Sequence, residues 1–164
     1  FSTAPATLTV DQSGNSVHDG NITGAVSIVK LGTGTLLFTG VHTTSGAFSV
    51  SNGVLAVGVA GSFGPNSTNI VVGGNGTLLL SNSVAIVDSA LVTLPASDVS
   101  TAKINLAADV TESVGWLCYG DKMQCAGSYG STGSAALFKD DSHFAGSGVL
   151  TVLHDNSGTM IKLR

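Results

Sequence analysis

A short pattern recurs along the chain, and it constrains the fold more than any other feature of the sequence. Each copy has a glycine in a turn, followed by a run of β-forming residues. A late copy lies at Gly146–Val152, and an early, weaker copy lies at Ser13–Val17. The clearest copies are Gly32–Phe38, Asn52–Val57 and Gly74–Leu80.

The spacing of these copies matches one coil of a parallel β-helix. Gly34 follows Gly14 by 20 residues, Gly53 follows Gly34 by 19, and Gly76 follows Gly53 by 23. A step of this length holds two or three short strands and their turns. A single coil cannot bury its apolar side, whereas stacked coils bury a continuous column and pair their backbone groups with one another. The spacing therefore predicts an all-β fold, a parallel β-helix or β-solenoid.

The segments between the glycine turns favour strands over helices. They are rich in β-branched and apolar residues, and Gly, Ser, Asn and Thr separate them. The best helix candidate is the stretch 97–114, but the alternation of Lys103–Leu106 favours a strand there, in a coil without the glycine. The rival architecture is an antiparallel sandwich or jelly roll. The predicted strands are Ala25–Leu31, Ala47–Val50, Asn69–Val72 and Thr77–Leu80.

The last third of the chain differs in composition from the rest. Charges return from about Asp109, and the tryptophan and both tyrosines lie beyond this point. The segments Val114–Tyr119 and Gly120–Cys125 read as a β-hairpin with a Gly-Asp turn. A bare last coil would be an open sheet edge, so solenoids need atypical ends. We therefore predict solenoid coils over residues 1–113 and a C-terminal end structure with the hairpin over residues 114–164.

Two cysteines, Cys118 and Cys125, flank the turn of this hairpin. Cysteines so close together in an exported protein can pair, and closing so small a loop stabilises the fold by about 2–3 kcal/mol. We expect a disulfide between them. The alternative is a pair of free, half-buried thiols.

Charge and hydropathy exclude several classes of partner. Charged residues make up only 10% of the chain, and none lies between Lys30 and Asp88. The net charge of −4 argues against nucleic acid, which requires clustered Lys and Arg. Mean hydropathy is high, at +0.40, but no apolar run approaches the ~18 residues of a membrane-spanning helix. We expect no membrane span, and a surface with so few charges favours association with its own copies.

The run Val29–Gly40 followed by Ser45–Val57 resembles the autotransporter-associated β-strand repeat, which reads as a lysine, a Gly-x-Gly-Thr-Leu core, a Thr-Gly turn and further strands. The tail of the chain resembles the region that closes such arrays in large bacterial surface proteins. The segments that carry this resemblance are Ile104–Leu106, Gly127–Gly130 and Phe144–Val152. The resemblance implies a right-handed β-helix, export across the cell envelope, and an extracellular or cell-surface location in a bacterium. The chain is too short to contain a translocator, so we expect a passenger fragment or a free-standing secreted subunit.

Residue types that carry enzymatic chemistry do not form recognisable motifs. The chain has no Gly-x-Ser-x-Gly elbow, and its four histidines lack the spacing of metal ligands. Gly73–Thr77 is close to a calcium-binding repeat, but Leu78 replaces the required acid. The polar cluster Asp140–His143 is expected to be a solvated turn. We predict no catalysis, no metal and no cofactor.

The first functional hypothesis is an extracellular structural subunit that binds copies of itself head to tail. A contact of this kind that does not close on itself produces a filament. The terminal segments alternate like strands, and either could add to the open sheet edge of a neighbour. The residues that represent these contact strands are Leu8, Val10, Met160, Ile161 and Leu163.

The second hypothesis is an adhesin module of a larger surface protein. Trp116, Tyr119 and Tyr129 could stack on the sugar rings of surface glycans. The same three residues could instead plug the end of the solenoid. The third hypothesis is a passive spacer without any ligand.

Overall fold

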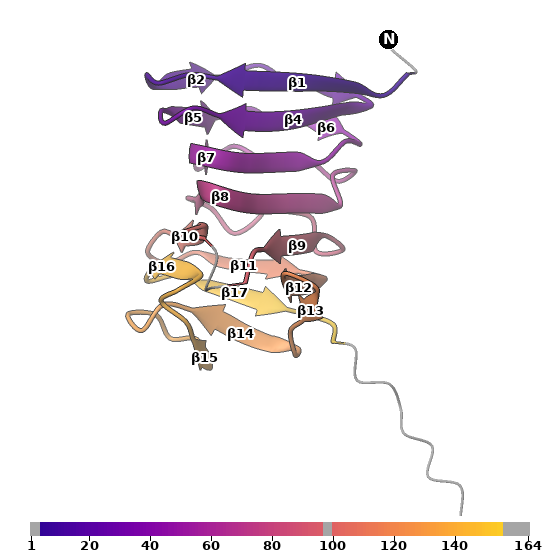
Figure 1. The fold of residues 1–164 in the computed structure, drawn as a ribbon. Coiled ribbons are helices and arrows are strands. Elements are labelled where there is room, and N and C mark those ends of the chain that lie inside the picture. Colours follow the sequence, from indigo (N-terminus) through magenta and orange to yellow (C-terminus); the bar gives the residue numbers. More distant parts are fainter. Residues whose placement is uncertain (1–3, 97–99, 156–164) are drawn as a thin grey trace, which may run out of the picture.

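The computed structural model describes residues 4–96 and 100–155, and within these ranges the chain is all-β, with no helix. About five turns of a β-solenoid are stacked along one axis (Figure 1). The strands are β1 (Ala6–Asp11), β2 (Ser16–His18), β3 (Thr23–Gly24), β4 (Val26–Leu31), β5 (Thr35–Phe38), β6 (Thr43–Thr44), β7 (Phe48–Val57), β8 (Asn69–Leu80), β9 (Leu91–Leu94), β10 (Lys103–Leu106), β11 (Thr111–Val114), β12 (Trp116–Tyr119), β13 (Lys122–Met123), β14 (Gly127–Gly130), β15 (Phe138–Lys139), β16 (Phe144–Gly146) and β17 (Val149–Val152).

The strands of successive coils pair in parallel. One face of the solenoid consists of β1, β4, the first halves of β7 and β8, then β9 and β12. The next face consists of β2, β5, the second halves of β7 and β8, then β10 and β16. In Figure 1 the near strands β1 and β4 run toward the left while the chain descends, so the superhelix is right-handed. The predicted fold class is confirmed, and the sandwich is excluded.

The corner glycines lie above one another, as their spacing predicts. Gly53 of β7 pairs with Gly76 of β8. A Cβ atom on Gly34 would lie only 2.0 Å from the carbonyl oxygen of Gly14, and one on Gly53 would lie 2.5 Å from that of Gly34. The backbone of Gly53 also has a positive φ of 66°, which glycine adopts more readily than other residues. These contacts allow successive coils to turn the same corner at strand spacing.

Inward-facing side chains form columns along the solenoid axis. Consecutive residues of a strand point to opposite faces, so the alternating pattern places every second residue inside. In β8, for example, Ile70 and Val72 are buried while Val71 between them is half-buried. The column that the pairing register defines on the first face contains Leu8, Ile28, Phe48, Ile70, Val92 and Leu117.

Two ionisable side chains are fully buried near the first coils. Lys30 lies in the interior, and its ammonium donates hydrogen bonds to the carbonyls of Leu31 and Gly32 at the adjoining corner. Burial lowers the pKa of Lys30, against the opposing charge of Asp11. His42 accepts a hydrogen bond from a backbone N–H of the first coil, and its burial, together with neighbouring His18, lowers its pKa to about 4. Both groups are therefore accommodated by backbone partners rather than by ion pairs.

The parallel stacking of strands continues beyond residue 113, into the region expected to hold the end structure. β12, β16 and β17 pair in parallel with β9, β10 and β11, so residues on both sides of that boundary belong to one stack. The end structure is the excursion 120–143 between β12 and β16. Its first part is the predicted hairpin, in which β12 pairs with β13 in antiparallel orientation. The strand prediction for Lys103–Leu106 is also confirmed, since this segment is β10 and pairs with β8.

Glu112 should make the stability of the fold decrease as the pH rises. The side chain is fully buried, and its carboxylate accepts hydrogen bonds from the N–H groups of Ala85 and Ile86, at 2.9 and 3.3 Å. Burial outweighs these bonds and raises its pKa from 4.5 to about 7. A raised carboxyl pKa favours folding at low pH, and this contribution is lost as the pH rises from the unfolded to the folded pKa.

We expect wild type to lose about 3 kcal/mol of stability relative to Glu112→Gln between pH 4.5 and pH 7. Urea unfolding of both proteins at a series of pH values measures this difference. A constant difference at every pH would contradict the assignment.

Candidate functional site

The first coil of the solenoid is open on its outer side. β1, β2 and β3 pair with β4, β5 and β6 of the second coil, and in the part of the chain that the structure describes they have no partner on their other edge. β1 alone presents six residues of extended backbone there. Unpaired N–H and C=O groups along such an edge are a template for a further strand.

The apolar interior is also uncovered at this end. Leu8 begins the column that continues through Ile28 and Phe48, yet its side chain is 43% exposed while those two are fully buried. Val10 of the same strand lies above Lys30 and is only half-buried. Val17 is 65% exposed as well, but it pairs with the outward Leu37 and faces away from the core. The open end therefore combines a free strand edge with an incomplete core column.

The opposite end of the solenoid is closed by the excursion 120–143. β13 covers the edge of β12, and β14 covers the edge of β17 in antiparallel orientation. The hydroxyl of Ser131 donates a hydrogen bond to the carbonyl of Gly146, next to β16. Tyr129 is buried beneath this closure, with ring centroids 4.8 Å from Phe138 and 6.3 Å from Phe144. The two ends of the molecule are thus structurally different.

The three aromatic residues proposed to contact glycans do not form one platform. Trp116 is half-buried on the outer side of β12, beside the ring of His154 at 5.0 Å. Tyr119 faces the interior from the same strand and stacks on His143, with centroids 3.8 Å apart and planes at 9°. Tyr129 is part of the closure. The structure therefore supports a plugging role for the two tyrosines and leaves only Trp116 facing outward.

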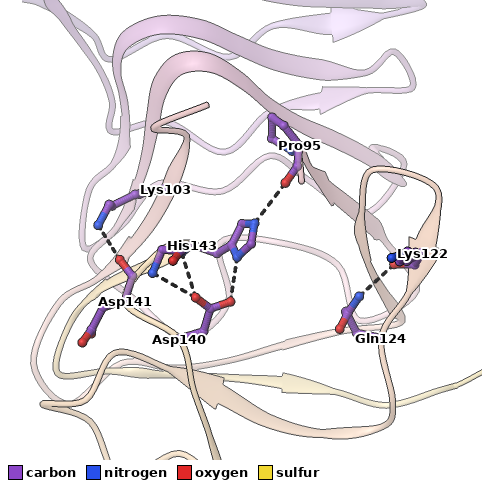
Figure 2. A network of polar contacts seen from close by, with 8 residues as sticks. Pro95, Lys103, Lys122, Gln124, Asp140, Asp141 and His143 are labelled. Carbon is purple, nitrogen blue, oxygen red and sulfur yellow. Dashed lines mark hydrogen bonds and ion pairs between the residues drawn. The ribbon is translucent and has the colours of Figure 1, made fainter. Parts of the chain in front are cut away.

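A polar network links the closure to the coil above it (Figure 2). The Nδ1 of His143 lies 2.6 Å from a carboxylate oxygen of Asp140, and its Nε2 lies 3.0 Å from the carbonyl oxygen of Pro95. Both partners are oxygen atoms that can accept a hydrogen bond from the ring. Burial alone would raise the pKa of Asp140, but the hydrogen bonds and charge of His143, with the N–H of Ser142, outweigh it and lower that pKa.

The segment Asp140–His143 is a turn, as expected, and Asp141 and Ser142 are exposed to solvent. The side chain of His143 departs from that expectation, because it is buried between Tyr119 and its two polar partners. Spacing along the sequence could not reveal this, because Pro95 and Tyr119 approach the turn only after the excursion has folded back.

A cleft of about 500 Å³ adjoins the network, lined by the hairpin residues 119–122 and Gln124 and by Ala96 and His143. The Gln124 side chain is held by a hydrogen bond to the carbonyl of Lys122, at 2.9 Å. The hydroxyl of Tyr119 is buried without a hydrogen bond of acceptable geometry. Burial, and then the nearby Asp140 carboxylate, raise the pKa of Tyr119, so its phenol stays protonated at neutral pH. The cleft offers contacts for a ligand, but it contains no activated nucleophile.

Both thiols are free in the structure, so the predicted disulfide between Cys118 and Cys125 is not supported. The hairpin register pairs Cys118 with Met123, and Cys125 lies two residues beyond Met123, past the end of β13. The sequence suggested pairing because it gives the length of the loop but not the register.

The structure places the remaining candidate residues as follows. Leu8 and Val10 lie in β1 at the open end, whereas Met160, Ile161 and Leu163 lie outside the described residues. Over residues 4–96 and 100–155, no three His, Cys, Asp or Glu side chains gather in a way that could hold a metal ion. The same part of the chain contains no helix of sufficient length and apolar character to cross a lipid bilayer.

Asp140→Asn should weaken the closure at neutral pH. The substitution removes the charge that His143 binds, and a hydrogen bond between charged groups contributes about 1.5–3 kcal/mol. Because the pKa of Asp140 is lowered in the fold, its contribution is present above the usual value of 3.8 and is lost as the pH falls below it. Thermal unfolding at pH 7 and at pH 3 tests both points.

Asp121→Asn, at the exposed turn of the same closure, is the matched control, and we expect it to change stability by less than about 0.5 kcal/mol. Equal effects of the two substitutions, or an effect of Asp140→Asn that is undiminished at low pH, would refute the assigned role.

In three comparisons with known proteins, the chain matches no family model, no curated protein sequence and no solved structure. The fold and the geometry of its two ends are therefore the basis for a functional proposal.

Proposed function

We propose that this chain is an extracellular structural module of a bacterial surface, a β-solenoid that associates with copies of itself through its open first coil. The observation that carries the proposal is the incomplete column at Leu8, whose side chain is 43% exposed above fully buried Ile28. A further strand above β1 would cover this column and pair the free edge. The location at a bacterial surface rests on the resemblance of Val29–Gly40 and Ser45–Val57 to autotransporter-associated repeats.

The difference between the two ends supports a head-to-tail arrangement. A symmetric contact would join two identical surfaces, whereas a contact between unlike surfaces can repeat indefinitely. Besides its covered edges, the closed end has exposed apolar side chains that an end-to-end contact would bury. Leu137 is 72% exposed, Met123 is 40% exposed and Phe138 is 38% exposed.

The low charge of the coils removes a barrier to such assembly. No Asp, Glu, Lys or Arg occurs between the buried Lys30 and Asp88, so the sides of the second and third coils are uncharged. Neighbouring copies therefore experience little electrostatic repulsion along their shafts, and low net charge promotes association.

Glycan binding is the second candidate function. The outward position of Trp116 and the cleft beside the hairpin favour it. The position of Trp116 weakens it, because Tyr119 and Tyr129 line one pocket of about 360 Å³ and Trp116 does not contribute to that pocket. This candidate predicts a monomer that binds sugars and loses that binding in Trp116→Ala.

Assembly should depend on Leu8 far more than on its exposed neighbour Val17. We expect ordered filaments whose axial repeat is a multiple of ~4.8 Å. Leu8→Lys places a charge over the core column and should raise the concentration needed for assembly about tenfold or more, which corresponds to ~1.4 kcal/mol. Negative-stain electron microscopy and sedimentation velocity over a concentration series measure this effect.

Val17→Lys is the control, because it adds the same charge to the same coil on a side chain that faces away from the core. A clean monomer at every concentration would reject self-association and leave glycan binding at Trp116 as the function to test. Filaments that resist Leu8→Lys would reject the open coil as the joint.

A further inference from the structure

The free edge of β1 has the length and polarity to accept one more parallel strand. Within residues 4–96 and 100–155, its six residues, Ala6–Asp11, pair on one side only, with Val26–Leu31 of β4. Leu8 and Val10 face the core column, and Thr9 between them faces outward. Any strand that completes this end must place apolar side chains beside Leu8 and Val10 and polar ones outside.

The segment Thr159–Arg164 has the complementary pattern. It reads Thr-Met-Ile-Lys-Leu-Arg, so Ile161 and Leu163 fall on one face of a strand, and Met160, Lys162 and Arg164 fall on the other. Two of the three residues on this second face are charged.

We propose that Thr159–Arg164 of one copy adds as a parallel strand to the free edge of β1 in the next copy. This inference rests on the proposed self-association and names the segment that makes the joint. With Thr159 beside Ala6, the register places Ile161 beside Leu8 and Leu163 beside Val10, which completes both core columns.

The same register places Arg164 beside Asp11, the exposed acid at the end of β1. Opposite charges on directly adjacent residues of neighbouring strands attract. An antiparallel addition centred on Leu8 would carry Arg164 past Ala6 and lose this pair. The charges therefore favour the parallel orientation, which also matches the pairing of β1 with β4.

The segment cannot reach β1 of its own chain. The N–H of His154 bonds to the carbonyl of Gly115, which fixes the chain at the coil of β12. In the order β1-β4-β7-β8-β9-β12, that coil lies five strand spacings from β1, or ~24 Å. Three residues lie between Asp155 and Thr159, and the four steps from one to the other span at most ~14 Å.

In a head-to-tail stack, by contrast, the closed end of one copy faces the open coil of the next. The last described residues leave the molecule at the closed end (Figure 1). The segment that follows them therefore meets the free β1 edge of the neighbouring copy. On the first face of that copy, the described residues leave no other strand edge open.

The experiment compares the 164-residue chain with a variant that lacks residues 159–164. Thermal unfolding of dilute samples verifies that the shortened chain is folded before assembly is compared. We expect the full chain to form filaments and the shortened chain to stay monomeric at concentrations about tenfold higher. Adding a synthetic peptide of sequence Thr-Met-Ile-Lys-Leu-Arg should inhibit assembly of the full chain, whereas a scrambled peptide should not.

The register is tested by engineered disulfides in a Cys118→Ser, Cys125→Ser background. Thr7→Cys and Met160→Cys, introduced into separate chains and mixed, should form covalent heterodimers under mild oxidation, because this register makes them adjacent. Thr9→Cys with Met160→Cys is the control, displaced by two residues. Arg164→Asp should weaken assembly, and combining it with Asp11→Arg should restore it.

The outcomes separate the two proposals. If the shortened chain forms filaments like the full chain, the donor strand is wrong and self-association stands. If neither protein assembles, self-association is wrong, and the donor strand with it. If only the full chain assembles but the Thr9→Cys control cross-links as well as the Thr7→Cys variant, the parallel register is overturned.

Discussion

The parallel register of backbone hydrogen bonds between successive coils decides the position of every side chain in this molecule. Because neighbouring strands stack at ~4.8 Å, equivalent residues of successive coils lie directly over one another. The interior is therefore a set of columns rather than a single cluster, and each column must be closed at both ends. Leu117 closes one column beneath the excursion and is fully buried, whereas Leu8 ends the same column and is exposed.

The interior also holds ionisable groups, and each is bonded to the backbone at a place where a strand ends. Lys30 donates to two corner carbonyls, His42 accepts from an N–H of the first coil, and Glu112 accepts from two N–H groups of the loop that precedes β9. Corners leave backbone groups without strand partners, and a buried polar group without a partner is costly. These side chains satisfy that requirement and link the loops to the coils.

The coils could be predicted from the sequence because their signals are local. The steps between Gly14, Gly34, Gly53 and Gly76 and the alternation within each strand were enough for fold class and strand positions. The excursion 120–143 was not predictable in the same way. Its hairpin was recognised, but the free state of Cys118 depends on cross-strand register. The burial of Tyr129 and the pairing of His143 depend on how the chain folds back onto strands distant in sequence.

The coil lengths differ between successive pairs of strands, and the difference is taken up at the corners and loops while the strands keep their register. Asn52 and Gly53 still pair with Asn75 and Gly76 across a shift that follows Val50. The number of coils in such a molecule is therefore independent of the structure of its two ends. Insertion or loss of a whole coil would change the length of the shaft by one strand spacing, while the chemistry of the open and closed ends would remain the same.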